Sequence, residues 1–477
     1  MGVDLLNIGK SGLFAAKKSM STTSHNIANA NTEGYSRQQV RLETSPAISE
    51  GNYTLGNGVD IQSVRRSHDE LIEKKLNISL SNNKFNEERT LQLSHVEEIF
   101  NEVNSEGMNK ILNRFFNSFR ELATQPENET IRNVVKENAR IVTGDFHRIQ
   151  DNLDQVRSSM NNKVKLSIDE INSLTETIAR LNKEINVQEV SGAQANDLRD
   201  QRDRAVGTLA EFFPLTTYSD NKGQYIVNVE GVGSLVSGGI AQKLVAGQGV
   251  DSNQSSSDKG NTDIYFAARP GISISSKIKG GTLGALFKTR DNDLESLEKQ
   301  LDQLAHGLVL ATNAIHRQGF ANHPSSSGKK ITGINFFKEP LELKRAAEYI
   351  SLSDEVLADA NNIATALEPD KPGDNRVAVA ISKLQHEKVL NNGTATFEEQ
   401  YHKSVGEVGL QSGKSKIDLE QSAGILAQAK SFKERLSGVS LDEEAANMVR
   451  YQNAYEASAK VIKASDEMFK AVLGLLG

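Results

Sequence analysis

The chain has 477 residues, and 55 lysines and arginines against 62 aspartates and glutamates give it a formal net charge of -7. This acidic balance argues against a nucleic-acid binder, because neutralising a phosphate backbone requires a surplus of basic side chains. Cysteine is absent, which excludes disulfide scaffolds, thiolate metal sites and cysteine nucleophiles. No apolar run reaches ten residues, so the sequence predicts neither a membrane-spanning helix nor the apolar core of a signal peptide.

The N-terminal segment predicts a basic helix whose apolar positions recur at intervals of three and four residues. Its seam has few large side chains, so we do not expect it to be stable as an isolated helix. Residues 25–37 follow with three asparagines and Gly34. Asparagine bonds to turn backbone and glycine accepts a positive φ, so this segment is suited to end the helix and turn the chain with a fixed geometry.

The next elements along the chain are amphipathic helices. Short apolar stripes lie at residues 93–103 and 111–122, and a proline-free stripe over residues 153–185 predicts one long helix. A stripe from Leu294 to Leu308 keeps heptad spacing. Helices with such narrow apolar stripes pack side by side, so they predict a bundle rather than a compact globule.

Between Pro214 and Gly284 the composition changes to glycine, serine and β-branched residues, which indicates strands and turns inserted between two helical halves. Residues 248–260 are interpreted as an exposed loop, and residues 322–375 as irregular. After Pro372 no proline occurs, and the chain is predicted to be helical to its end. Its last helix is acidic, so it complements the basic N-terminal helix and is predicted to pair with it or with copies of it.

Several motifs suggest catalytic or binding chemistry but are better explained otherwise. Residues 9–11 and 413–415 both spell Gly-Lys-Ser, yet they lack the earlier glycine of a phosphate-binding loop. The histidines have no helical metal spacing. Asp197, Asp200 and Asp203 share a helix face but alternate with arginines, which favours a surface ion-pair network over a divalent-cation site. We predict no catalytic residue, no metal site and no cofactor.

The two ends of the chain resemble the bacterial flagellar axial proteins, the family of rod, hook and hook-associated proteins. The resemblance is carried by residues 25–37 at one end and by residues 441–447 and 451–462 at the other. The interior segments 196–203, 280–286 and 373–375, with Gly34-Tyr35-Ser36-Arg37-Gln38, are similar to the hook-associated branch. Glu33 stands where the family often has proline, and the β insertion is short, so a second outer β domain found in some relatives is not expected.

The resemblance implies a mainly α fold with a β insertion, divided into three parts. Residues 1–45 with 440–477 would form a terminal coiled-coil assembly domain. Residues 46–210 with 284–439 would form a bundle of long helices, and residues 211–283 an outer β-rich domain, to which the irregular stretch 322–375 is a candidate contributor.

The resemblance also implies a structural role without catalysis, in a ring that joins the hook to the filament. Its partners would be copies of itself, the hook protein, a second junction protein and an export chaperone on the C-terminal helix, with no nucleic acid and no membrane insertion. The protein would be extracellular, exported through the flagellar type III apparatus without a cleaved signal peptide. The turn into the outer bundle would be set by Asn26, Asn29, Gly34 and Tyr35. The seam between subunits would consist of Leu6, Leu13, Met20, Ile27, Met448, Gln452, Tyr455, Ala459, Ile462 and Phe469.

Two alternatives stay open at this point. Another axial protein, such as a hook protein or a flagellin-like protein, would share the termini but not the interior segments. An intracellular helical scaffold or enzyme with a β insertion would explain the apolar stripes but not the matched ends.

Overall fold

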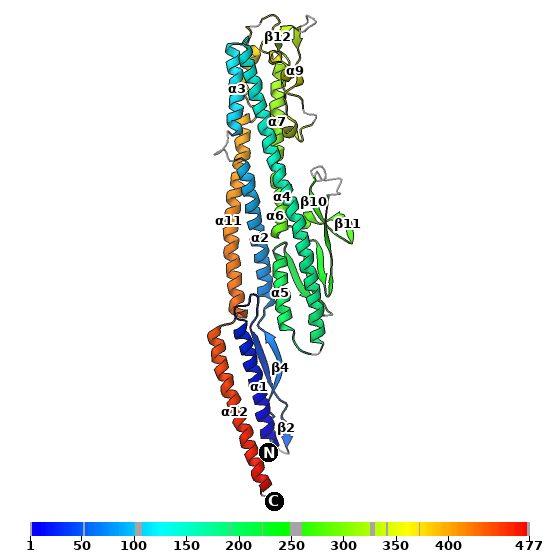
Figure 1. The fold of residues 1–477 in the computed structure, drawn as a ribbon, viewed down its shortest axis with the longest axis vertical. Coiled ribbons are helices and arrows are strands. Elements are labelled where there is room, and N and C mark those ends of the chain that lie inside the picture. Colours follow the sequence, from blue (N-terminus) through cyan, green and yellow to red (C-terminus); the bar gives the residue numbers. More distant parts are fainter. Residues whose placement is uncertain are drawn as a thin grey trace.

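The computed structural model describes residues 2–50, 53–100, 107–190, 192–221, 223–248, 260–324, 330–339, 342–371 and 373–474. The molecule is a long rod, with a bundle of helices along most of its length and a small β domain on one side (Figure 1). Both termini lie together at one end of the rod. The predicted fold class, mainly α with a β insertion, is confirmed.

The helices have the following bounds: α1 Gly2–Ala28, α2 Glu70–Ile99, α3 Met108–Thr124, α4 Glu129–Glu189, α5 Asn196–Ala210, α6 Gly281–Lys288, α7 Glu295–His316, α8 Ala346–Tyr349, α9 Asp354–Ala358, α10 Arg376–Lys383, α11 Phe397–Ser437 and α12 Leu441–Gly474. The strands are β1 Gln38–Thr44, β2 Ile48–Glu50, β3 Tyr53–Leu55, β4 Val59–Arg66, β5 Leu215–Ser219, β6 Tyr225–Val229, β7 Gly233–Ser237, β8 Ile240–Ala241, β9 Leu244–Gln248, β10 Thr262–Phe266, β11 Arg269–Ser273, β12 Phe320–Pro324 and β13 Lys330–Thr332. Residues 249–259, most of the predicted loop, lie outside the described residues.

The long helices begin where the sequence supplies side-chain caps. Asn128 accepts hydrogen bonds from the backbone N–H groups of Thr130 and Ile131 at the start of α4, which then runs for 61 residues and contains the predicted helix 153–185. Thr396 and Glu399 form a reciprocal capping box at the start of α11. These caps satisfy N–H groups that the helices themselves leave without partners.

The bundle has an aromatic core at the end far from the termini. Phe115 of α3 packs there against Phe336 and Phe337, with ring centroids 5.9 Å apart in both pairs. The backbone N–H groups of Phe336 and Phe337 both donate to Oδ1 of Asn313 on α7. Among the described residues, the irregular stretch 322–375 therefore packs into this distal core, and its candidate contribution to the outer β domain is not seen.

The β domain consists of two antiparallel sheets, with strand orders β5-β6-β7-β8 and β11-β10-β9. Three asparagines of α4, spaced by about three turns, hydrogen-bond its backbone. Asn161 accepts from the Thr262 N–H, Asn182 donates to the Gly238 carbonyl, and Asn172 bonds to both the N–H and the carbonyl of Leu244. The domain is therefore docked along α4 through main-chain groups as well as through its apolar core.

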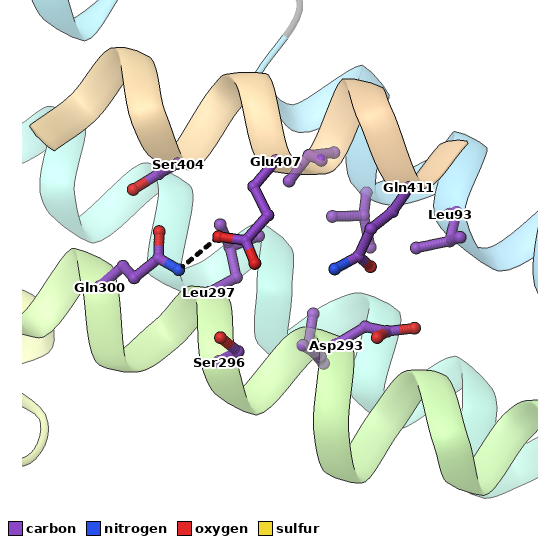
Figure 2. Close-up of a pocket in the computed structure, with 11 residues that line it drawn as sticks. Leu93, Asp293, Ser296, Leu297, Gln300, Ser404, Glu407 and Gln411 are labelled. Atoms are coloured by element: carbon purple, nitrogen blue, oxygen red, sulfur yellow. Dashed lines mark hydrogen bonds between the residues drawn. The ribbon is translucent and has the colours of Figure 1, made fainter. Parts of the chain in front are cut away.

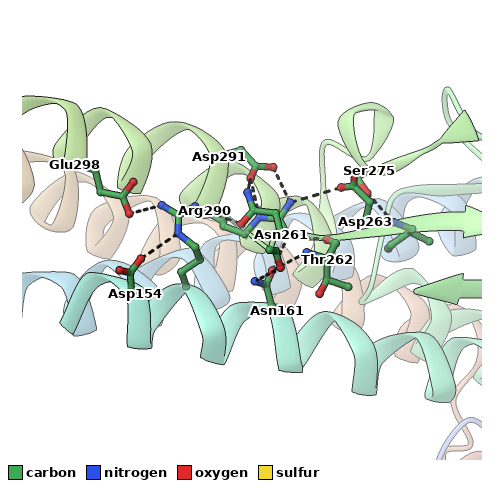
Figure 3. Close-up of polar contacts among 12 residues, drawn as sticks. Asp154, Asn161, Asn261, Thr262, Asp263, Ser275, Arg290, Asp291 and Glu298 are labelled. Atoms are coloured by element: carbon green, nitrogen blue, oxygen red, sulfur yellow. Dashed lines mark hydrogen bonds and ion pairs between the residues drawn. The ribbon is translucent and has the colours of Figure 1, made fainter. Parts of the chain in front are cut away.

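A buried arginine reinforces this docking where α6 and α7 meet. Thr289–Leu294 form a π-helical segment there, and Arg290 projects from it toward β10 (Figure 3). Its Nη1 donates to Asn161 Oδ1 at 2.8 Å and to the Thr262 carbonyl at 2.7 Å, while Asp291 binds the other edge of the guanidinium. A buried cation is tolerated here because every contact is charge-assisted or satisfies a backbone group.

Candidate functional site

The two terminal helices, α1 and α12, lie side by side below the bundle (Figure 1). Their contact is close because α1 presents small residues to α12. A Cβ added to Gly9 would lie 2.8 Å from Ile462 Cγ1, and one added to Gly12 would lie 2.8 Å from Ser458 Oγ. The buried residues of α1 are all small or polar: Gly9, Ala15, Ala16, Ser19, Thr22, Thr23 and Asn26.

A two-stranded ribbon, β1 with β4, covers another side of α1. Gly58, at the end of the ribbon, has φ +92° and presses against Ser11, whose Oγ accepts a hydrogen bond from the Val59 N–H at 3.2 Å. In the Gly-Lys-Ser motif of residues 9–11, Gly9 therefore packs against α12 and Ser11 against the ribbon. The ribbon places residues 38–44 and 59–66 along α1, so the chain beside the terminal helices includes residues beyond 45.

Asn26 is the centre of a polar junction where the terminal helices meet the body. Its side chain is 1% exposed, and all of its hydrogen-bonding capacity is used. Oδ1 accepts from the Tyr35 hydroxyl at 2.8 Å and from the Gln38 N–H at 2.9 Å. Nδ2 donates to the Gln38 carbonyl at 2.9 Å and to Glu444 Oε2 at 3.1 Å. One side chain therefore ties α1, the turn, β1 and α12 together.

Arg37 and Glu444 complete the link to the C-terminal half. Arg37 Nε donates to Glu444 Oε1 at 2.7 Å, and its Nη1 bonds to Glu443 at 2.9 Å. The Arg37 N–H donates to the Ser437 carbonyl, and the Arg37 carbonyl accepts from the Ser67 N–H. The bend between α11 and α12 is thereby held by the same segment that leaves α1.

The third side of the junction is α5, where the structure corrects the prediction of a surface ion-pair network. Asp200 is only 4% exposed. It accepts from the Ser36 N–H at 2.9 Å and from Arg66 Nη1 at 2.8 Å, while Asp203 lies 2.6 Å from the same guanidinium and Asp197 accepts from Gln38 at 2.7 Å. Arg66 supplies the positive charge that compensates the burial of Asp200 and Asp203, whereas Asp197 stays exposed. Together the three carboxylates are a docking site for the N-terminal segment.

The surroundings of the junction raise the pKa values of Tyr35 and Arg66. Burial, with Asp197, Asp200 and Glu444 nearby, raises the pKa of Tyr35 well above its usual range, so its hydroxyl stays a donor. Burial acts against the charge of Arg66, but Asp203 and Asp200 outweigh it and raise its pKa. Tyr35 and Arg66 therefore remain hydrogen-bond donors at neutral pH.

The predicted turn residues lie within or beside this junction. Gly34 has φ +75°, and a Cβ there would lie 2.9 Å from Arg204 Nε. Asn29 closes the end of α1 by donating to the His25 carbonyl at 3.0 Å, and Thr32 donates to its Oδ1. Asn26 and Tyr35 bond directly to each other.

The predicted seam residues lie along the α1–α12 pair and are incompletely covered. Ile462 lies within the contact between the two helices, against Gly9. Phe469 is 53% exposed, and Leu6 and Ile27 are also exposed. Gln452 is exposed, whereas Leu13, Met20, Met448, Tyr455 and Ala459 are partly buried.

Two hollows lie among the helices, one inside the bundle and one at the junction. Figure 2 shows a gap among α2, α7 and α11 in which Gln300 Nε2 donates to Glu407 Oε2 at 2.9 Å. Its volume of about 20 Å³ accommodates a single water molecule. A polar groove of about 830 Å³ lies at the junction among the turn, α2, α5 and α11. Within the described ranges no group of three or more histidine, aspartate or glutamate side chains is placed to hold a metal ion.

The sequence did not reveal the partners that close the junction. Arg66, Gln38 and Glu444 are ordinary polar residues in the sequence, and their partners are 134, 159 and 418 residues away. Their proximity in space depends on the complete fold. The described part of the chain also contains no helix with the length and hydropathy needed to cross a membrane.

Comparisons with known proteins match both the ends and the body of the chain. The model for the helical domain of flagellar hook-associated protein FlgK matches residues 93–337, about half of the chain. The models "Flagella basal body rod protein" and "Flagellar basal body rod FlgEFG protein C-terminal" match residues 6–35 and 435–475.

Similar proteins span the full chain. Flagellar hook-associated protein 1 of Bacillus subtilis is 28% identical over 99% of this chain and 98% of its own length. Those of Escherichia coli and Salmonella typhimurium are 24% and 26% identical over 99% of both chains. The solved structure of the flagellar hook junction protein FlgK from Burkholderia pseudomallei shares the fold, with a TM-score of 0.65, 15% identity, and coverage of 76% of this chain and all of that one.

Proposed function

Because this chain belongs to the FlgK family of flagellar hook-associated proteins, we propose that its paired terminal helices are the surface through which copies assemble into a ring. The chain is a structural component of the hook–filament junction and not an enzyme. Membership of the axial family implies assembly with hook and filament proteins. The alternatives of another axial protein or an intracellular scaffold are not supported by the match over residues 93–337.

The observation that carries the proposal is the apolar surface left on the terminal pair. α1 touches α12 through small residues, and most of the large aliphatic and aromatic side chains of the two helices remain exposed. They are Leu5, Leu6, Ile8, Phe14, Ile27, Leu441, Val449, Met468, Phe469, Val472 and Leu473. Such a concentration on two narrow helices indicates an interaction surface rather than a solvated one.

The junction around Asn26 gives this surface a defined direction. Its hydrogen bonds connect α1, α12 and α5, so the terminal pair is held at a set angle to the body. In a ring, an error in that angle would be repeated in every subunit. We infer that Asn26, Gly34 and Tyr35 maintain the angle that lets neighbouring terminal pairs meet.

The finer partners and the export route belong to the same proposal. A ring at the junction would contact hook protein on one side and a second junction protein on the other. Before export, a chaperone would cover the apolar side of α12, where Met468, Phe469 and Leu473 are exposed. The chain would leave the cell through the flagellar export channel without a cleaved signal peptide, a route for which the absence of cysteine is suited.

The test is a charge placed on the exposed side of α12. Phe469→Asp puts a carboxylate on a surface that assembly would bury, at a cost of several kcal/mol per contact. Because Phe469 is 53% exposed, the isolated chain should keep its fold and helical content. In cells that carry only this variant, we expect hooks without filaments.

Val187→Asp on α4 is the matched control, because its side chain is also exposed and lies away from the terminal pair. It should leave filaments and motility at the wild-type level. If cells with Phe469→Asp build filaments as well as the control does, the terminal pair is not the assembly surface. Circular dichroism of both purified variants excludes a general loss of folding as the cause.

A further inference from the structure

The outward side of α11 is a second apolar surface, in the body of the molecule. α11 packs against α2 and α7 on one side. Leu410, Ile417 and Ile425 recur at intervals of seven and eight residues, so they share another side of the helix. Leu410 is 74% and Ile417 67% exposed. A solvated side of a 41-residue helix would be expected to carry polar side chains at these positions.

The glycines of α11 point to the close approach of something outside the chain. Cβ atoms added at Gly406, Gly409, Gly413 or Gly424 would meet no heavy atom within 4 Å. Glycine is among the least favourable residues inside a helix, so its use four times needs a reason. Within the described residues there is none. A neighbouring helix packed closely on α11 would supply one.

This surface is continuous with the terminal helices. Three residues separate the end of α11 from the start of α12, and the two helices follow each other along one edge of the rod (Figure 1). Phe432 and Leu436 near the end of α11 are exposed, as are Leu441 and Val449 on α12. An assembly that covers the terminal pair would therefore bring the same neighbour alongside α11.

The neighbour is a second copy in the same orientation. A hook–filament junction has different partners at its two ends, so its subunits must all point in one direction. A two-fold contact of α11 with itself would reverse one copy, and the contact is therefore between two different faces of the chain.

The partner face is found on α4 at the same height. Lys163 of α4 pairs with Glu88 of α2 at 2.6 Å, and Thr90, one half-turn further along α2, bonds to the Ser415 carbonyl of α11 at 3.0 Å. Leu166, which is 70% exposed, is therefore level with Ile417. In a ring whose axis is parallel to the rod, equal heights on adjacent copies face each other.

We propose that the outward side of α11, centred on Ile417, packs on α4 of the next copy around Leu166. The proposal rests on the proposed function, since it requires copies to stand side by side in a ring. Charges beside the two apolar residues agree with it. Glu420 on α11 and Lys165 on α4 are opposite in sign, and neither has an ion-pair partner among the described residues.

The first test uses the glycines. Gly413→Ala and Gly424→Ala should slow local opening of α11 about fivefold each in hydrogen exchange, because alanine favours the helix. The same changes should reduce the number of filaments per cell several-fold, because the added methyl groups hold the neighbour away. Gly207→Ala in α5, where a Cβ would make only ordinary contacts, should leave filament number unchanged. Normal assembly with a stabilised α11 would overturn the proposal.

The second test uses the absence of cysteine in the chain. A protein with both Ile417→Cys and Leu166→Cys should form covalent oligomers in isolated hook–filament complexes treated with a short thiol cross-linker. Each single variant should remain monomeric on a denaturing gel. Cross-linking of Ile417→Cys alone, or none in the double variant, would refute the pairing.

An antibody against the chain separates this failure from that of the proposed function. If the chain is present at the junction but no cross-link forms, only the contact between α11 and α4 is wrong. If the chain is absent from the junction of complexes that carry filaments, the proposed ring itself is refuted.

Discussion

Replacing Asn26 by alanine should loosen the terminal helices from the body while leaving the body folded. The side chain is 1% exposed and makes four hydrogen bonds, two of them to the main chain of Gln38. β1 pairs with β4 along its other edge, so the N–H and carbonyl of Gln38 have Asn26 as their partner. Alanine would leave both groups buried without a hydrogen bond.

The magnitude follows from counting the groups that cannot find a new partner. Tyr35 is half-buried and can turn toward water, and Glu444 keeps its bond to Arg37. The two groups of Gln38 then remain, at about 1–3 kcal/mol each. The junction should therefore weaken by about 2–6 kcal/mol, which corresponds to at least about a 30-fold increase in local opening.

Hydrogen exchange measured by mass spectrometry is the suitable assay, because a chain with separate cores does not unfold in one step. Peptides covering residues 20–45 and 436–450 should exchange faster in Asn26→Ala, whereas peptides from α4 should not change. Asn29→Ala is the matched control. Its side chain bonds only to residues within four positions in α1 and the turn, so it should cost less than about 1 kcal/mol.

Asn26→Asp provides a second variant with nearly the same shape. It keeps the acceptor for Tyr35 and loses both donors, and it places a carboxylate opposite Glu444. It should open the junction at least as much as alanine does. If both variants exchange within a few-fold of Asn29→Ala, the junction does not hold the terminal pair, and the reasoning fails.

Two further predictions concern other positions. Gly34→Ala should weaken the junction by about 1–2 kcal/mol, because a φ of +75° strains any residue with a Cβ. Gly34→Asn should recover part of that loss, because asparagine tolerates a positive φ better than alanine. Equal hydrogen exchange at the junction in the wild type and both variants would contradict this prediction. His316 is buried, its Nε2 accepts from the Ala364 N–H at 2.9 Å, and burial lowers its pKa to about 4. In the unfolded chain the His316 imidazole is protonated near pH 6.5, whereas in the folded chain it stays neutral until about pH 4. The free energy of unfolding therefore falls by up to about 3 kcal/mol as the pH falls from 6.5 to 4. In urea unfolding of the distal core, His316→Gln should lack this part of the pH dependence; an unchanged pH profile would rule out His316 as its source.

The sequence by itself determined the long amphipathic helices, the β insertion and the pairing of the two ends. The helix predicted from Pro372 to the end of the chain is instead divided into α10, α11 and α12, with non-helical residues at 384–396 and 438–440. Apolar side chains at intervals of three and four residues are a local property of the sequence. This spacing predicts α4 and α7 without any knowledge of the elements that pack against them. Glycine, serine and β-branched residues between 214 and 284 likewise mark the β domain locally. The motifs at both ends indicated the family, because each is a short continuous segment that can be compared on its own.

Other features of the fold could not be predicted from the sequence, because no local pattern of residues indicates them. The β1–β4 ribbon was not predicted, since its strands are mostly exposed and show no clean alternation of apolar and polar residues. The irregular stretch around Phe336 joins the distal core only because Asn313 on a distant helix binds its backbone. Sequence spacing cannot predict a partner supplied by a separate element.

The candidate site likewise contains some features that the sequence predicts and others that only the tertiary structure shows. The turn-forming character of Asn26 and Gly34 follows from residue type and could be predicted from the sequence, whereas Tyr35 was expected only from the family resemblance. The burial of Asp200 was not, because a carboxylate beside arginines on a helix is usually solvated. Only the tertiary structure brings Arg66 and the Ser36 N–H onto it, since whether a charge can be buried depends on what the rest of the chain places around it.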